Sequence, residues 1–134
     1  MKKIAVIGLG YVGLTLAVSL ADVGFKVTGI DSNEEIVDKL NQGIPHIHEI
    51  GLESLLKFHI GKNLTVQSTS SQSDSDVYIL CVQTPIDENN EPILEYLNGA
   101  TQYVADNLSK NNLVIIRSTV PIGTTRTNII PLLE

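Results

Sequence analysis

The chain has very little cysteine and no cluster of basic side chains. Its single cysteine among 134 residues cannot form an intrachain disulfide, and no set of cysteines and histidines has zinc-site spacing. Nine basic against fifteen acidic side chains give a formal net charge of −6, which does not suit binding to a nucleic-acid backbone. The single cysteine excludes an internal disulfide and favours a reduced, cytoplasmic protein. The acidic net charge disfavours nucleic acid as a partner.

Runs of like charge are also missing and the overall composition is that of a globular protein, so disorder, collagen and coiled coil are excluded. Hydrophobic residues make up 43% and charged residues 18% of the chain, as in an ordinary globular protein. The length predicts one domain, residues 1–134, whose core is large enough to fold unaided.

One long uncharged stretch, residues 4–21, follows two lysines and has the character of a signal peptide or a transmembrane helix. However, Gly8, Gly10 and Gly13 stand in this stretch where a hydrophobic helix would have leucine. We therefore predict a strand, a glycine turn and a helix here, and no membrane partner.

Short β-branched runs alternate along the chain with stretches of helical spacing. The predicted strands cover residues 3–7, 26–30, 64–66, 77–82 and 113–116, and the predicted helices cover 12–23, 33–40, 52–58, 97–108 and a last segment from about Pro121. Strands alternating with helices predict right-handed crossovers and a parallel sheet with helices on both faces. The predicted fold is a single α/β domain, a doubly wound sheet of the Rossmann type.

The first predicted strand runs into Gly8-Leu9-Gly10-Tyr11-Val12-Gly13, which fits the pattern G-x-G-x-x-G. In such a turn the first glycine permits a tight bend, the second lets the backbone approach a pyrophosphate, and the third allows close helix packing. Asp31 ends the next predicted strand, as a dinucleotide-binding unit requires. The alternative is an ordinary strand–helix turn.

Asp31 is the residue that we expect to choose the cofactor. A carboxylate there accepts hydrogen bonds from the adenosine ribose and repels a 2′-phosphate. Residues 32–35 add two acids and no arginine, so NAD is favoured over NADP. The alternative is that Asp31 only caps the next helix, although Asn33 can also cap it.

Cysteine and histidine offer weaker signals. Cys81 continues the apolar strand over residues 77–82 with no basic neighbour in sequence, so we expect a packed thiol rather than a nucleophile. His46 and His48 form an H-x-H pair, but two ligands without a third do not make a metal site. We predict no metal.

Two more segments follow predicted strands, at the edge where doubly wound sheets bind ligands. They are residues 81–85, Cys-Val-Gln-Thr-Pro, and residues 117–125, Arg-Ser-Thr-Val-Pro-Ile-Gly-Thr-Thr. Their interpretation as cofactor-contacting loops competes with ordinary turn and cap chemistry.

Residues 8–14, the C-V-x-T-P segment and the S-T-V-P-x-G-T-T segment, in this order, resemble the NAD-binding domain of the UDP-glucose/GDP-mannose dehydrogenase family. Residues 41–52, which include Ile44-Pro45-His46-Ile47-His48-Glu49, resemble the branch that acts on UDP-N-acetylhexosamines, especially UDP-N-acetylmannosamine. The resemblance implies an enzyme that oxidises a sugar C6 hydroxyl to a carboxylate in two NAD-dependent steps, through a cysteine-bound thioester.

The resemblance also implies roles for single residues. By position, the adenosine diphosphate part of NAD is held by Gly8, Leu9, Gly10, Tyr11, Val12, Gly13 and Asp31. The cofactor is lined by Val82, Thr84 and Pro85. The nicotinamide lies near Ser118 and Thr119. Thr119 matches a threonine that helps to order the catalytic water. Three positions depart from the pattern, because Ile36, Ile50 and Ile93 replace a basic residue of some members, a proline and an aspartate.

The family's catalytic cysteine, lysine and asparagine belong to segments that this sequence does not contain. The resemblance therefore implies an inactive, monomeric cofactor-binding part of a longer, homo-oligomeric enzyme whose substrate is a nucleotide sugar. Two other classes share the glycine turn: a regulatory nucleotide-sensing module and the NAD-binding domain of a β-hydroxyacid dehydrogenase. Residues 81–85 and 117–125 favour the sugar dehydrogenase over both.

Overall fold

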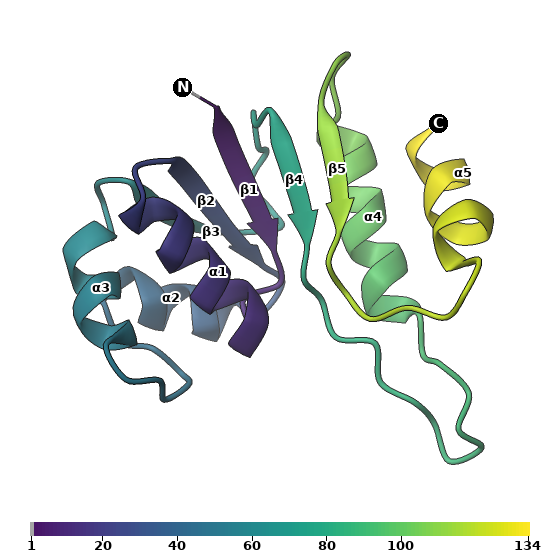
Figure 1. The fold of residues 1–134 in the computed structure, drawn as a ribbon, viewed down its shortest axis with the longest axis horizontal. Coiled ribbons are helices and arrows are strands. Elements are labelled where there is room, and N and C mark those ends of the chain that lie inside the picture. The colour runs from purple at the N-terminus through teal and green to yellow at the C-terminus, as the bar shows by residue number, and fades with distance from the viewer. Residues whose placement is uncertain (1) are drawn as a thin grey trace.

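Five short apolar segments form one parallel sheet in the computed structural model, which describes residues 2–134 (Figure 1). The strands are β1 (Lys3–Ile7), β2 (Lys26–Asp31), β3 (Leu64–Ser68), β4 (Val77–Leu80) and β5 (Leu113–Ile116). Their spatial order is β3-β2-β1-β4-β5, so β1 lies in the middle and pairs with β2 and β4. This is the doubly wound order, and it confirms the predicted fold class.

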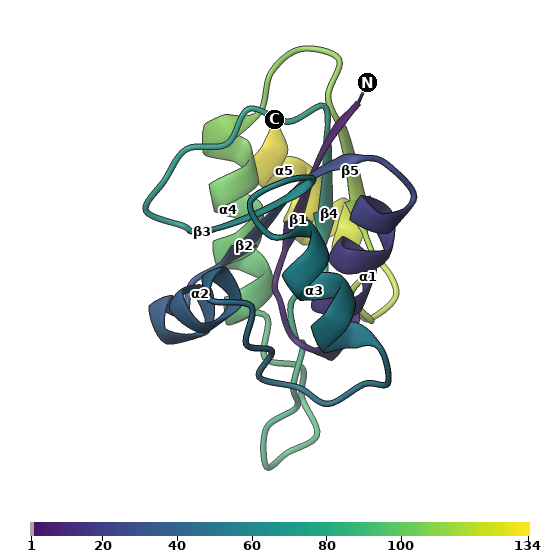
Figure 2. The same cartoon turned by 90° about the vertical axis from the view of Figure 1, so that its left-hand side faces the viewer.

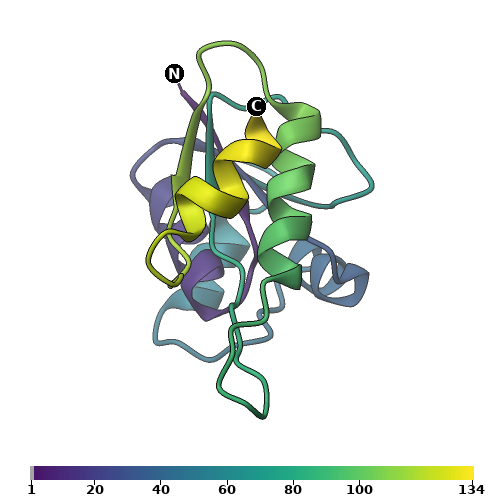
Figure 3. The ribbon, with the colours of Figure 1, turned by 90° about the vertical axis from the view of Figure 1, so that its right-hand side faces the viewer.

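Helices cover both faces of the sheet. They are α1 (Tyr11–Asp22), α2 (Glu34–Asn41), α3 (Leu52–His59), α4 (Glu95–Asn107), the π-helical segment η1 (Thr125–Ile129) and α5 (Ile130–Leu133). Figure 1 shows α1 in front of the sheet and α4 behind it, and the turned view of Figure 2 shows the same two helices on opposite sides. Figure 3 shows η1 and α5 alongside α4, which they contact.

The core consists of two apolar clusters, one on each face of the sheet. Ile4 and Val6 of β1 join the cluster beneath α1, α2 and α3, whereas Ala5 and Ile7 join the cluster beneath α4. All four side chains are buried, which explains why β1 reads as a continuous apolar run.

The uncharged stretch over residues 4–21 folds as β1, the glycine turn and α1. The helix ends at Asp22, and Gly24 just beyond it has a φ of +105°, which suits the left-handed conformation that follows many helices. The N–H groups of Gly24 and Phe25 donate to the carbonyls of Ala21 and Leu20, both at 3.1 Å. Within residues 2–134, no helix has the length and hydropathy that a bilayer crossing requires.

Several predicted boundaries are wrong by two residues or more: β3 extends to Ser68 rather than residue 66, and α4 begins at Glu95 rather than residue 97. Strand β4 ends at Leu80 rather than Val82, because the Leu80 carbonyl accepts the N–H groups of both Arg117 and Ser118 and the regular ladder stops there. The last helix begins at Thr124 rather than near Pro121, because Gly123 has a φ of +92° and closes a turn before the helix.

Gly13 provides a test of the packing between α1 and the end of β1. A Cβ atom at this position would lie 1.7 Å from the Gly8 carbonyl oxygen, so we expect Gly13→Ala to lower the free energy of unfolding by about 3 kcal/mol. Gly99, inside α4, has no atom within 4 Å of a built Cβ, and Gly99→Ala should be about 0.5–1 kcal/mol more stable than the parent. Urea unfolding followed by circular dichroism measures both, and equal stability of the two variants would contradict the packing argument.

Candidate functional site

The turn between β1 and α1 contains three glycines with different tasks. Gly8 has a φ of +93°, and a Cβ there would lie 2.9 Å from the backbone nitrogen of Val82. Gly13 lies against the Gly8 carbonyl, as described above. Gly10 has no atom within 4 Å of a built Cβ. Gly8 and Gly13 are therefore required by packing, whereas Gly10 borders open space that a ligand can occupy.

The N-terminus of α1 is built to receive an anion. Its N-cap is Gly10, which offers no side chain to the first turn, and that turn contains no acidic residue. The first N–H groups of a helix have no intrahelical acceptor, and the helix dipole adds partial positive charge at this end. An uncapped N-terminus that follows a glycine turn is a pyrophosphate-binding arrangement.

Asp31, at the end of β2, is joined to this turn. Its Oδ2 accepts the N–H of Leu9 at 2.8 Å, and its Oδ1 accepts the N–H of Asn33 at 2.9 Å. The cap of α2 is instead Asn33, whose side-chain oxygen accepts the N–H groups of Glu35 and Ile36. The interpretation of Asp31 as only a helix cap is therefore wrong. A carboxylate oxygen can accept a second hydrogen bond, so Asp31 retains acceptor capacity for a ribose.

The loops that follow β4 and β5 are tied together. The Ser118 hydroxyl donates to the Val82 carbonyl at 2.7 Å, and the Thr84 hydroxyl donates to the Thr119 carbonyl. The two sequence segments that resemble the dehydrogenase family are therefore neighbours at the carboxyl edge of the sheet, beside the glycine turn.

A cleft of about 1090 Å³ runs along this edge. It is lined by most of the residues that the sequence assigns to the cofactor: Gly8, Gly10, Tyr11, Val12, Asp31, Val82, Thr84, Ser118 and Thr119. Three predicted residues do not line it. Leu9 and Gly13 are buried, and Pro85 shapes its loop by accepting the Ile93 N–H at 2.7 Å.

The cleft also contains residues that the sequence did not single out for the cofactor. They are Asn33, Ile36, His46, Ile47, Thr69, Tyr96, Tyr103 and Arg117, among others. Some of them carried a sequence signal of another kind: Arg117 opens the segment over residues 117–125, and His46 and Ile47 belong to the stretch over residues 41–52. Thr69, Tyr96 and Tyr103 carried none, and only the crossover geometry brings them to this edge.

Cys81 lies one residue past β4 and forms part of the cleft wall. The prediction that Cys81 is packed inside the strand over residues 77–82 is therefore wrong, because the residue lies beyond the strand and is half-buried. Burial raises the pKa of the thiol to about 11, although the Arg117 charge acts in the opposite direction. The thiol is therefore protonated at neutral pH and is a poor nucleophile.

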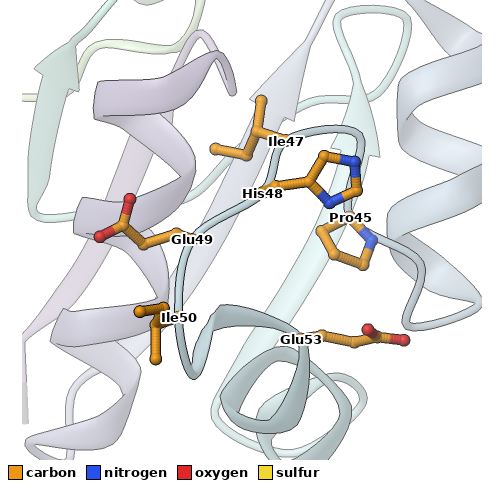
Figure 4. Close-up of a pocket in the computed structure, with 6 residues that line it drawn as sticks. All are labelled: Pro45, Ile47, His48, Glu49, Ile50 and Glu53. Carbon is orange, nitrogen blue, oxygen red and sulfur yellow. The ribbon is translucent and has the colours of Figure 1, made fainter.

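The loop over residues 42–51, between α2 and α3, closes one flank of the cleft. Tyr11 donates its hydroxyl to Glu49, and this hydrogen bond raises the pKa of the Tyr11 phenol. Figure 4 shows Glu49 turned toward α1. The six residues drawn there line a smaller hollow of about 310 Å³. Ile50, one of the departures from the family pattern, is fully exposed there. Within residues 2–134, no three potential ligands among His, Cys, Asp and Glu are grouped for a metal.

A glycine turn, an uncapped helix, an acid at the end of β2 and a cleft at the carboxyl edge define a dinucleotide-binding domain of the Rossmann class. Residues 2–134 match the family model described as the NAD binding domain of the UDP-glucose/GDP-mannose dehydrogenase family. The chain belongs to this family and is its NAD-binding domain, which confirms the resemblance. The sensing module and the β-hydroxyacid dehydrogenase are thereby set aside.

Relatives and solved structures agree with this assignment. The UDP-N-acetyl-D-mannosamine dehydrogenase of Campylobacter jejuni is 42% identical over 125 residues, which are 92% of this chain and 30% of that protein. UDP-D-ManNAc dehydrogenase from Pyrococcus horikoshii has a TM-score of 0.91 and 39% identity over 97% of this chain and 31% of that one. A ternary complex of GDP-mannose dehydrogenase from Pseudomonas aeruginosa has a TM-score of 0.90 and 34% identity over 100% of this chain and 32% of that one. The chain thus spans about a third of these relatives.

The Cys81 thiol provides a test of the cleft. With a pKa of about 11, its thiolate fraction at pH 8 is small, so we expect alkylation by iodoacetamide to be about a hundredfold slower than in the urea-unfolded chain. The rate should rise with pH toward 11 and fall when NAD fills the cleft. Mass spectrometry measures the rate, and labelling as fast as in the unfolded chain would contradict this environment.

Proposed function

We propose that this chain binds NAD for a nucleotide-sugar 6-dehydrogenase, in which a UDP-sugar, of the UDP-N-acetylhexosamine class, is oxidised at C6 to the carboxylate. The observation that carries the proposal is the meeting of the glycine turn, Asp31 and the linked loops after β4 and β5 in one cleft. The names of the relatives from Campylobacter and Pyrococcus support the N-acetylmannosamine derivative as the sugar.

Each part of the cleft receives a part of the cofactor in this proposal. The N-terminus of α1 binds the diphosphate, with Gly10 leaving room for it. Asp31 accepts hydrogen bonds from the adenosine ribose. Val82 and Thr84 line the middle of the dinucleotide, and Ser118 and Thr119 lie near the nicotinamide, where Thr119 helps to order water.

The chemistry divides between this domain and the rest of the enzyme. Bound NAD supplies the hydride acceptor, and two molecules of it are needed to take an alcohol through an aldehyde to a carboxylate. The second oxidation also needs a thiolate, which Cys81 does not provide because its thiol is half-buried and protonated. We assign the nucleophile, the base and most of the sugar site to the two thirds of the relatives that this chain does not span.

The same proposal includes the partners of the domain, its oligomeric state and its cellular compartment. The nucleotide-sugar substrate is its partner, and nucleic acid and membrane are not. The isolated domain is a monomer, the complete enzyme is a homo-oligomer, and both are cytoplasmic, as the single free cysteine and the acidic composition favour.

Calorimetric titration tests the choice of cofactor. We expect tighter binding of NAD than of NADP, because a 2′-phosphate would meet the Asp31 carboxylate in the cleft. Asp31→Ala should narrow the difference by about 1–3 kcal/mol, the scale of hydrogen bonds to a charged group. It should also weaken both cofactors, since Leu9 and Asn33 lose their acceptor. Asp38→Asn, an exposed change on α2, serves as the control, and an unchanged ratio in Asp31→Ala would contradict the assignment.

Turnover tests the proposed reaction. Residues 1–134 alone should produce no NADH absorbance with any UDP-hexose or UDP-N-acetylhexosamine, because hydride transfer needs the sugar held against the nicotinamide and a base to take its proton. A chimera that joins this domain to the remaining two thirds of the Pyrococcus enzyme should be active. Gly10→Val in that chimera should abolish activity without loss of the fold, since its side chain occupies the space for the diphosphate. Activity of residues 1–134 alone, or a folded, NAD-binding chimera that oxidises none of these sugars, would refute the proposal.

A further inference from the structure

His46 has an unusual environment in the cleft wall. Both ring nitrogens are enclosed, and neither has a hydrogen-bond partner. Among the cleft-lining residues that the structure describes, it is the one whose side chain has buried polar atoms left unpaired. An imidazole always carries at least one N–H donor, so an unmade hydrogen bond is left beside the cleft.

A buried polar atom without a hydrogen-bond partner lowers the stability of the fold. Its hydrogen bonds to water are lost on burial and no protein partner replaces them, so native proteins contain few such atoms. Since the His46 ring belongs to the cleft wall, a turn of the side chain that brings one nitrogen to the cleft surface lets a bound ligand remove this cost.

The charges along the cleft point to the kind of ligand. Its acidic residues are Asp31 and Glu95, and its only permanent cation within the described residues is Arg117. Arg117 follows β5, which is separated from β1 by β4, so it lies on the nicotinamide side. On the other side, beside Asp31 and the start of α1, the cleft is lined by no lysine or arginine among the described residues. Besides the Asn33 amide and the N–H groups of α1, His46 offers a side-chain nitrogen donor on that side for a diphosphate or its ribose.

The loop around His46 is held in place on both flanks. Ile47 packs against the core cluster beneath α1, α2 and α3. Glu49 accepts the hydroxyl hydrogen of Tyr11, the first residue of α1. The loop that contains His46 is therefore joined to the first residue of α1, the helix whose N-terminus borders the same cleft.

We propose that His46 donates an imidazole N–H to the adenosine diphosphate half of the dinucleotide, on the side of the cleft that has no lysine or arginine among the described residues. The proposal rests on the proposed binding of NAD in this cleft. In this proposal His46 contributes to the affinity for the cofactor, whereas His48, the second histidine of the H-x-H pair, does not.

The test compares His46→Ala and His46→Gln with His48→Ala, a change of an exposed histidine in the same loop. Titration with ADP-ribose and with NAD should show binding about 3- to 30-fold weaker in His46→Ala, partial recovery in His46→Gln, whose amide can donate, and no change in His48→Ala. Circular dichroism establishes that each variant is folded.

A second measurement uses the unaltered chain. In 15N-histidine-labelled protein, ADP-ribose should shift the imidazole nitrogens of His46 and leave those of His48 and His59 in place. If the unaltered chain binds NAD and neither the affinity nor the His46 signal changes, this inference is wrong and the proposed function stands. If the unaltered chain binds neither ligand, both fail.

Discussion

The rest of the site depends on the close approach between α1 and the end of β1. The Cα of Gly13 lies so near the Gly8 carbonyl that a Cβ atom would stand 1.7 Å from its oxygen. Only glycine permits this approach, and the approach places the uncapped start of α1 over the carboxyl edge of the sheet. Gly8 in turn lies against the backbone of Cys81 and Val82, so the exit of β4 is drawn to the same point.

Asp31 joins the stability of this turn to the recognition of the cofactor. Its two oxygens hold the backbone of Leu9 and Asn33, and the same carboxylate faces the cleft where an adenosine ribose would lie. In the proposed function, one side chain therefore both builds the turn and distinguishes a ribose hydroxyl from a phosphate. A substitution there changes the shape of the turn as well as its charge.

The cleft has one wall made of backbone and another made of side chains. Near β1 it offers the N–H groups of a helix and open space beside Gly10, which suit any dinucleotide. Its flanks are formed by the loop over residues 42–51 and by the linked loops after β4 and β5, and these carry the features particular to this family. The solved relatives are about three times as long as this chain.

By itself, the sequence determined the local units. Glycine spacing between an apolar run and a helical pattern defined the turn, Asn33 defined the start of α2, and alternating strands and helices defined the parallel sheet, because each signal acts over a few residues. Only the tertiary structure decided the placement of Cys81 in the cleft wall, the unpaired nitrogens of His46, and the joining of Tyr11 to Glu49 and Thr84 to Thr119. Those pairs are 38 and 35 residues apart, and the crossovers of the whole sheet, which no local pattern encodes, bring them into contact.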